Sequence, residues 1–125
     1  MSIEPKKIKI LLVEDSPLMR KMEVKTLETI GFEGIIEADD GNIAVSILQS
    51  DQQVDLIISD WNMPNMSGFE LHVWVRADAK CKAIPFLMAT GQSDRAQAEK
   101  ATEAGVSSFI AKPFNAEELR VRIEE

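Results

Sequence analysis

Side chains with useful chemistry follow directly after four apolar stretches of this sequence. They are two adjacent carboxylates, a third carboxylate, a hydroxyl and an ammonium group: Glu14, Asp15, Asp60, Thr90 and Lys112. Oxygen-only ligation, with no His or Cys nearby, favours a hard cation such as Mg²⁺ over zinc. A divalent cation beside a lysine and a hydroxyl suits a phosphoryl group, whose charge must be neutralised. A carboxylate at such a place can act as a nucleophile and form an aspartyl phosphate.

These groups meet only if the chain brings its apolar stretches together. Short apolar runs alternate with longer segments of helical periodicity, which predicts five strands that are each followed by a helix. The predicted strands are residues 8–13, 34–37, 54–59, 84–89 and 107–111. The predicted helices are residues 17–30, 41–49, 69–78, 93–104 and a last one from 115 onward. This alternation predicts an α/β fold, a flavodoxin-like (βα)5 three-layer sandwich with a parallel five-stranded sheet of order 2-1-3-4-5.

In an open parallel sheet, sites form outside the carboxyl ends of the strands, so the five side chains are expected at one edge. Each of them alone also has a structural interpretation. Asp15 could cap the first helix, and Lys112 could be a solvated lysine. A common site is favoured because the first, third, fourth and fifth predicted strands are all followed by such residues.

Length and composition narrow the function further. The chain of 125 residues predicts a single domain over residues 1–125, and its formal net charge of −7 disfavours binding to nucleic acid or to an anionic membrane. No apolar run reaches the roughly 18 residues of a membrane helix, and no signal peptide opens the chain. One histidine, His72, excludes a multi-histidine zinc site, and one cysteine, Cys81, excludes an internal disulfide. A cytoplasmic location is expected.

Four ordered segments resemble one known family. They are Leu11–Ser16, Ser59–Gly68, Met88–Gly91 and Ala111–Phe114. Their residues and spacing resemble the CheY-like receiver domains of two-component response regulators. The resemblance covers the chain from Ile8 to the last helix, and it is specific because all four motifs occur in order.

The resemblance implies a role for each residue of the acidic group. Asp60 corresponds to the phosphoacceptor and is also expected to be a metal ligand, and Glu14 and Asp15 correspond to the acidic pair that holds Mg²⁺. Asn62 stands where the family uses a main-chain carbonyl as a further metal ligand. Trp61, directly after the acceptor, is expected to be partly exposed.

The remaining predicted site residues belong to the switch. The resemblance implies that Thr90 is the hydroxyl that moves toward the phosphoryl oxygens, and that Lys112 is the cation that pairs with them. Phe109 occupies the second switch position, where CheY has tyrosine, and it offers no hydroxyl to a partner. The face formed by the helix 93–104, the strand 107–111 and the last helix would then change its affinity for a partner.

The implied function is a signalling switch with its own phosphorylation and dephosphorylation activity, and not an enzyme for an external substrate. A sensor histidine kinase or phosphotransfer protein would donate the phosphoryl group, and a downstream output domain or target protein would read the change. A homodimer is left open. The chain is either a stand-alone regulator or the N-terminal receiver of a longer one. The second is favoured because the last helix ends in Arg122–Glu125 with no Gly or Pro stop.

Two other functions remain open at the level of sequence. One is a small Mg²⁺-dependent phosphatase or phosphotransferase that uses Asp60 on an external substrate, although such enzymes usually have a second acid where Asn62 stands. The other is a receiver-like scaffold that is not phosphorylated. The complete set of acidic, hydroxyl and lysine side chains disfavours the scaffold.

Overall fold

The computed structural model describes residues 8–61, 63, 65–90, 108–111 and 114–124. Five parallel strands form one sheet in the order β2-β1-β3-β4-β5, which confirms the predicted flavodoxin-like order. The strands are β1 (Lys9–Val13), β2 (Gly34–Ala38), β3 (Leu56–Asp60), β4 (Phe86–Thr90) and β5 (Ser108–Ala111). The sheet therefore carries the ends of β1, β3, β4 and β5 to a single carboxyl edge.

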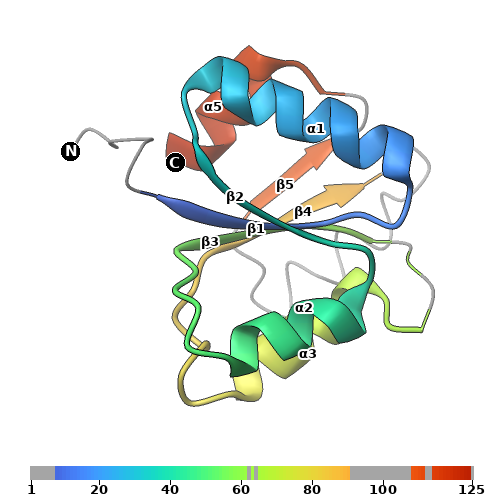
Figure 1. The fold of residues 1–125 in the computed structure, drawn as a ribbon, viewed down its shortest axis with the longest axis vertical. Coiled ribbons are helices and arrows are strands. Elements are labelled where there is room, and N and C mark those ends of the chain that lie inside the picture. Colours follow the sequence, from blue (N-terminus) through green and yellow to red (C-terminus); the bar gives the residue numbers. More distant parts are fainter. Residues whose placement is uncertain (1–7, 62, 64, 91–107, 112–113, 125) are drawn as a thin grey trace.

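Helices cover both faces of the sheet. They are α1 (Pro17–Ile30), α2 (Gly41–Gln49), α3 (Gly68–Ala77) and α5 (Ala116–Glu124). Figure 1 shows α1 and α5 on one face and α2 and α3 on the other, which gives the predicted three layers. The helix predicted over residues 93–104 lies outside the described residues. Among the helices described, none combines the length and the apolar character needed to cross a membrane.

Two hydrophobic clusters, one on each face, hold the layers together. Leu11 and Ile57 point to the side of α2 and α3, whereas Ile10, Leu12 and Ile58 point to the side of α1 and α5. All five side chains are at most 1% exposed. Strands with both faces covered need apolar residues at every position, which explains why the runs 10–13 and 56–58 are continuously apolar.

Each described helix begins at the carboxyl edge with a capping side chain. The side chains of Ser16, Asp40, Ser67 and Asn115 each accept a hydrogen bond from the N–H group three residues further on. Such a cap satisfies a backbone donor that the helix leaves open, and it contributes about 1 kcal/mol. The caps fix where each loop at this edge ends.

The amino edge of the sheet is closed by basic side chains that bind main-chain carbonyls. Arg76, at the end of α3, donates from Nη1 to the carbonyls of Lys82 at 3.0 Å and Ile84 at 2.7 Å. Lys80 donates from Nζ to the carbonyl of Leu48 in α2. These contacts fasten the connections that lead into β3 and β4.

Candidate functional site

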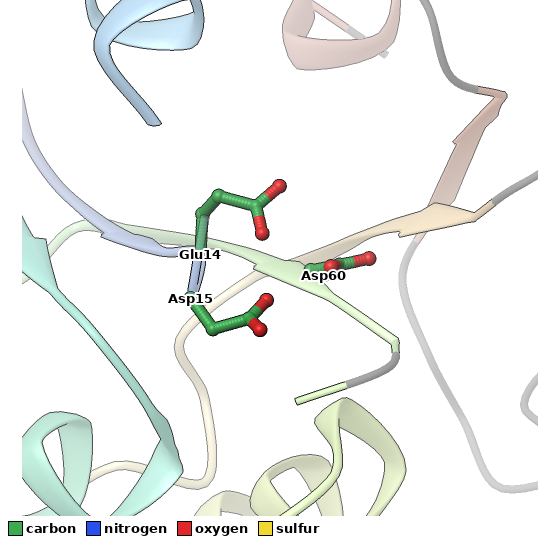
Figure 2. A group of neighbouring side chains, drawn as sticks. All are labelled: Glu14, Asp15 and Asp60. Atoms are coloured by element: carbon green, nitrogen blue, oxygen red, sulfur yellow. The ribbon is translucent and has the colours of Figure 1, made fainter. Parts of the chain in front are cut away.

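Three carboxylates lie together at the carboxyl edge. Oxygen atoms of Glu14, Asp15 and Asp60 all lie within 4.8 Å of one another. Glu14 is 1% exposed, Asp60 is half-buried and Asp15 is exposed, so the cluster reaches from the interior to the surface. Val13 pairs with Ser59 across β1 and β3, which places Glu14 and Asp60 level with each other one residue later. Figure 2 shows Glu14 and Asp15 directly after β1 and Asp60 at the end of β3, with the carboxylates of Glu14 and Asp15 above and below the ribbon and both extending toward the side of Asp60.

The start of α1 decides the role that the sequence left open for Asp15. Ser16, and not Asp15, is the N-cap of α1, because its Oγ accepts the N–H of Met19 at 3.3 Å. The N–H of Ser16 in turn donates to Oε2 of Glu14 at 3.3 Å. The turn thus positions Glu14 and leaves the Asp15 carboxylate in the acidic cluster.

Glu14 is also held through its main chain. Its N–H donates to the carbonyl of Ala38 at 3.1 Å, and its carbonyl accepts Nη1 of Arg20 at 2.7 Å. Arg20 forms ion pairs with Glu37 at 3.2 Å and Asp39 at 2.8 Å. The end of β1 is therefore bound both to β2 and to the turn that follows β2.

Asp60 is held by the close approach of α3. A Cβ atom on Gly68 would lie 2.2 Å from the Asp60 carbonyl oxygen, so only glycine allows the helix to begin there. The N–H of Gly68 donates to the carbonyl of Trp61 at 2.8 Å, and Oγ of Ser59 donates to the Asp60 carbonyl at 3.0 Å. The backbone on both sides of Asp60 is fixed before any ligand arrives.

The donor set of this cluster fits a magnesium ion. Opposite oxygens around octahedral Mg²⁺ are about 4.2 Å apart. Three carboxylate oxygens within 4.8 Å can therefore approach one ion with small side-chain movements. Carboxylates this close repel one another unless a cation intervenes. The cluster contains only hard oxygen donors, which bind Mg²⁺ in preference to softer metals.

Comparison with known proteins identifies the family of this chain. The family described as "Response regulator receiver domain" matches residues 10–124. The chain belongs to this receiver domain family. The chemotaxis protein CheY of Pseudomonas aeruginosa is 42% identical over 118 residues, which are 94% of each chain. Receiver domains interact with histidine kinases and output domains. As a member of this family, the chain is a two-component signalling domain rather than a conventional enzyme.

Solved receiver structures share the fold. Chemotaxis response regulator CheY4 of Vibrio cholerae has a TM-score of 0.83 and 36% identity, covering 94% of this chain and 96% of its own. The receiver domain of sensor histidine kinase PA1611 from P. aeruginosa has a TM-score of 0.82 and 28% identity, covering 94% and 95%. That structure is described as having a magnesium ion coordinated in the active site cleft.

At the carboxyl edge, the loop before α2 and the loop before α3 are clamped to each other. Asn65 lies at a φ of 68°, and its Nδ2 donates to Oδ2 of Asp40 at 3.1 Å. A Cβ on Gly41 would come within 2.7 Å of Met66, so these loops also pack closely. The N–H of Ile43 is the main cause that lowers the pKa of Asp40, and the hydrogen bond from Asn65 lowers that pKa further. Asp40 is therefore a charged anchor between the loops.

Trp61 corrects one expectation. It was expected to be partly exposed, but only 7% of its surface is accessible. Its ring lies 5.6 Å from the ring of Phe69 at an interplanar angle of 35°. The sequence suggested exposure because Trp61 follows a charged residue at a strand end, whereas the first turn of α3 in fact covers it.

The other predicted receiver residues are placed by their backbone. Thr90 ends β4, one residue beyond the pairing of Asp60 with Ala89, and it pairs with Ala111 at the end of β5. Phe109 lies in β5. The predictions for Asn62 and Lys112 fall on positions outside the described residues.

Sequence reasoning missed three residues that hold the carboxyl-edge segments around the cluster. They are Arg20, Asn65 and Gly68. The helix was predicted to begin at residue 69, directly after Gly68, and the place of this glycine before an apolar periodic segment was the available signal. Arg20 had no comparable signal, because its partners, Glu37 near the end of β2 and Asp39 in the turn after it, are distant in the sequence.

Proposed function

We propose that Asp60 accepts a phosphoryl group from a sensor histidine kinase or a phosphotransfer protein in a Mg²⁺-dependent reaction. The supporting observation is the cluster of Glu14, Asp15 and Asp60 at the carboxyl edge of a receiver fold. The magnesium ion described in the related histidine kinase receiver supports the same use of this edge. Glu14 and Asp15, together with the main-chain carbonyl of Asn62, hold the ion beside Asp60.

The transfer itself needs little from the protein beyond position and charge. A carboxylate oxygen of Asp60 forms the new P–O bond while the P–N bond to the donor histidine breaks, and the electron pair of that bond stays on the histidine nitrogen. Bound Mg²⁺ supplies positive charge beside the phosphoryl oxygens. The fixed backbone around Asp60, between Ser59 and Gly68, keeps the nucleophile in place during the attack.

The response to phosphorylation begins at the neighbouring strands. Lys112 pairs with the phosphoryl oxygens, and the hydroxyl of Thr90 moves toward them. Phe109 then turns inward. Thr90 and Phe109 belong to β4 and β5, which are paired along their length, so a change at the edge reaches the outer strand directly. The face formed by the helix predicted over residues 93–104, β5 and α5 changes its affinity for a target or an attached output domain.

The setting of this switch is proposed on the same basis. Residues 1–125 form one receiver domain in the cytoplasm, where kinases of this type phosphorylate their partners. Its output is a separate target protein or an attached domain, and a second copy of the chain is a further candidate partner. The formal charge of −7 disfavours direct binding to nucleic acid.

The test is the intact mass of the protein after incubation with acetyl phosphate and Mg²⁺. We expect one phosphoryl adduct on the wild type, no adduct on Asp60→Asn, and no adduct when a chelator removes the metal. Asp51→Asn is the matched control, because it makes the same substitution at an exposed position outside the cluster, and it should be phosphorylated normally.

The adduct should also disappear with time after the donor is removed, because the domain catalyses its own dephosphorylation. Equal labelling of the wild type and Asp60→Asn would place the reaction elsewhere. An absence of labelling together with an absence of Mg²⁺ binding would leave the receiver fold intact and favour a scaffold that is not phosphorylated.

A further inference from the structure

Arg20 connects the acidic pair after β1 to the turn after β2. Its Nη1 donates to the main-chain carbonyl of Glu14 at 2.7 Å. The same guanidinium forms ion pairs with Glu37 at 3.2 Å and Asp39 at 2.8 Å. The Arg20 side chain is 16% exposed, whereas those of Glu37 and Asp39 are 50% and 66% exposed. The arginine is thus the better covered member of a contact whose other side chains face water.

The carbonyl that Arg20 binds belongs to the peptide unit between Glu14 and Asp15. A peptide unit is planar and rigid, so a hydrogen bond to its oxygen fixes the direction in which both flanking residues project their side chains. The bond is short because its donor is charged. On the other side, the N–H of Glu14 donates to Ala38. Two adjacent carboxylates of the cluster are therefore aimed by contacts to one backbone segment.

The ion pairs to Glu37 and Asp39 hold the guanidinium rather than stabilise the fold. Exposed ion pairs contribute between about 0 and 1 kcal/mol, because water and salt screen them. A guanidinium is nevertheless a rigid fork, and contacts to two of its nitrogens fix the direction of its N–H bonds. Glu37 and Asp39 consequently direct Nη1 at the Glu14 carbonyl.

We propose that Arg20 is a positioning residue for the Mg²⁺ site, acting through the peptide unit between Glu14 and Asp15. This inference rests on the proposed function, since it concerns the ion that the acidic cluster holds. Residues that orient metal ligands without touching the metal typically change metal affinity by about 10- to 100-fold when they are replaced. Loss of Arg20 should therefore weaken Mg²⁺ binding more than it weakens the fold.

Arg76 is the matched control for a merely structural arginine. Its Nη1 also donates to main-chain carbonyls, those of Lys82 and Ile84, but it does so at the amino edge of the sheet. It lies eight residues after Gly68 along α3, which is about 12 Å along a helix. Replacing Arg76 removes the same kind of contact at the edge that has no part in the acidic cluster.

The experiment is calorimetric titration of Mg²⁺ into the wild type, Arg20→Ala and Arg76→Ala, with urea unfolding of each protein. We expect Arg20→Ala to raise the Mg²⁺ dissociation constant about tenfold or more, whereas Arg76→Ala leaves it within about twofold while also lowering stability. Should Arg20→Ala fail to fold, the double variant Glu37→Gln with Asp39→Asn removes the two ion pairs that hold the guanidinium. This variant should also raise the Mg²⁺ dissociation constant.

A double-mutant cycle distinguishes an effect of Arg20 through Glu14 from a general destabilisation of the fold. If Arg20 acts through Glu14, then Arg20→Ala costs less affinity in a Glu14→Gln background than in the wild type. Equal dissociation constants for Arg20→Ala and Arg76→Ala would overturn the inference and leave the proposed function standing. Additive effects in the cycle would also overturn it. A wild type that does not bind Mg²⁺ would overturn both proposals.

Discussion

At the carboxyl edge of the sheet, Arg20 joins the Glu14 carbonyl to the carboxylates of Glu37 in β2 and of Asp39 in the turn after it, whereas at the amino edge Arg76 donates to main-chain carbonyls of the connection that follows its own helix. Both side chains use the same donor chemistry. The difference is that the carboxyl-edge contacts link separate segments, one of which carries Glu14 and Asp15 of the acidic cluster. A contact at that edge can therefore affect the site, while one at the amino edge supports only the fold.

The largest expected effect is that of a methyl group at Gly68. Gly68→Ala places a Cβ against the Asp60 carbonyl at 2.2 Å, and backbone atoms cannot give way cheaply. We expect a loss of about 1 to 3 kcal/mol in the free energy of unfolding, because overpacking forces the backbone to shift. Phosphorylation of Asp60 should fall as well, which the intact-mass assay measures.

Gly34→Ala is the amino-edge counterpart of that change. Its Cβ would meet the Lys9 side chain at 2.7 Å, which can move aside, and the main-chain oxygen of Ile8 at 3.0 Å, a contact that a small backbone shift relieves. We expect a stability within about 1 kcal/mol of the wild type, since alanine also restricts the unfolded chain. Equal losses for the two variants in urea unfolding would remove the distinction between the edges.

A smaller effect is expected at the clamp between the two loops. The pKa of Asp40 is lowered in the folded protein, chiefly by the N–H of Ile43. The unfolded chain therefore takes up this proton first, and stability rises with pH in that range. The contribution is complete above the ordinary value of 3.8 and is lost as pH falls through the lower folded pKa.

Comparison with Asp40→Asn isolates this contribution from the other carboxylates. The difference in unfolding free energy between the wild type and this variant should shrink on going from pH 5 to pH 3. The change should not exceed about 1 kcal/mol, because the group is a partly exposed helix cap. A difference that does not vary with pH would show that the Asp40 charge has no role in the clamp.

The smallest expected effect on the site comes from the amino-edge thiol. Cys81 is 1% exposed, and burial raises the pKa of its thiol. Iodoacetamide should modify the folded protein far more slowly than the unfolded protein, since the thiolate is the reactive form. Cys81→Ala should leave Mg²⁺ affinity unchanged. A change in affinity would show that the amino edge does communicate with the cluster.

The sequence predicted the sheet and the acidic cluster well because both depend on local patterns. Continuous apolar runs define β1 and β3, and a polar residue after each run marks its carboxyl end. The helical connections leave only a few strand orders, of which 2-1-3-4-5 is the commonest for a domain of this size, and that order predicts the meeting of Glu14, Asp15 and Asp60. The residue types indicated the chemistry, and the likeness to a known family then suggested the role of each residue.

The supporting contacts could not be predicted in the same way. Arg20 and Asp39 are 19 residues apart and meet only once β1 and β2 have paired. Asn65 and Asp40 depend on the packing of two loops, which no local pattern specifies. The choice between Asp15 and Ser16 as the cap of α1 was likewise settled by geometry, because both residue types cap helices.

The common direction of the four described helices has a consequence for charge. α1, α2, α3 and α5 all begin at the carboxyl edge, so their amino ends, each equivalent to about half a positive charge, gather where the chain places its carboxylates. Their carboxyl ends gather at the opposite edge, where Lys80 lies against α2 and Arg76 stands in the last turn of α3. The macrodipoles of the helices therefore favour both the acidic cluster at the carboxyl edge and the Lys80 and Arg76 side chains at the amino edge. The same acidic cluster built at the other edge would lie against the negative helix ends and would be destabilised.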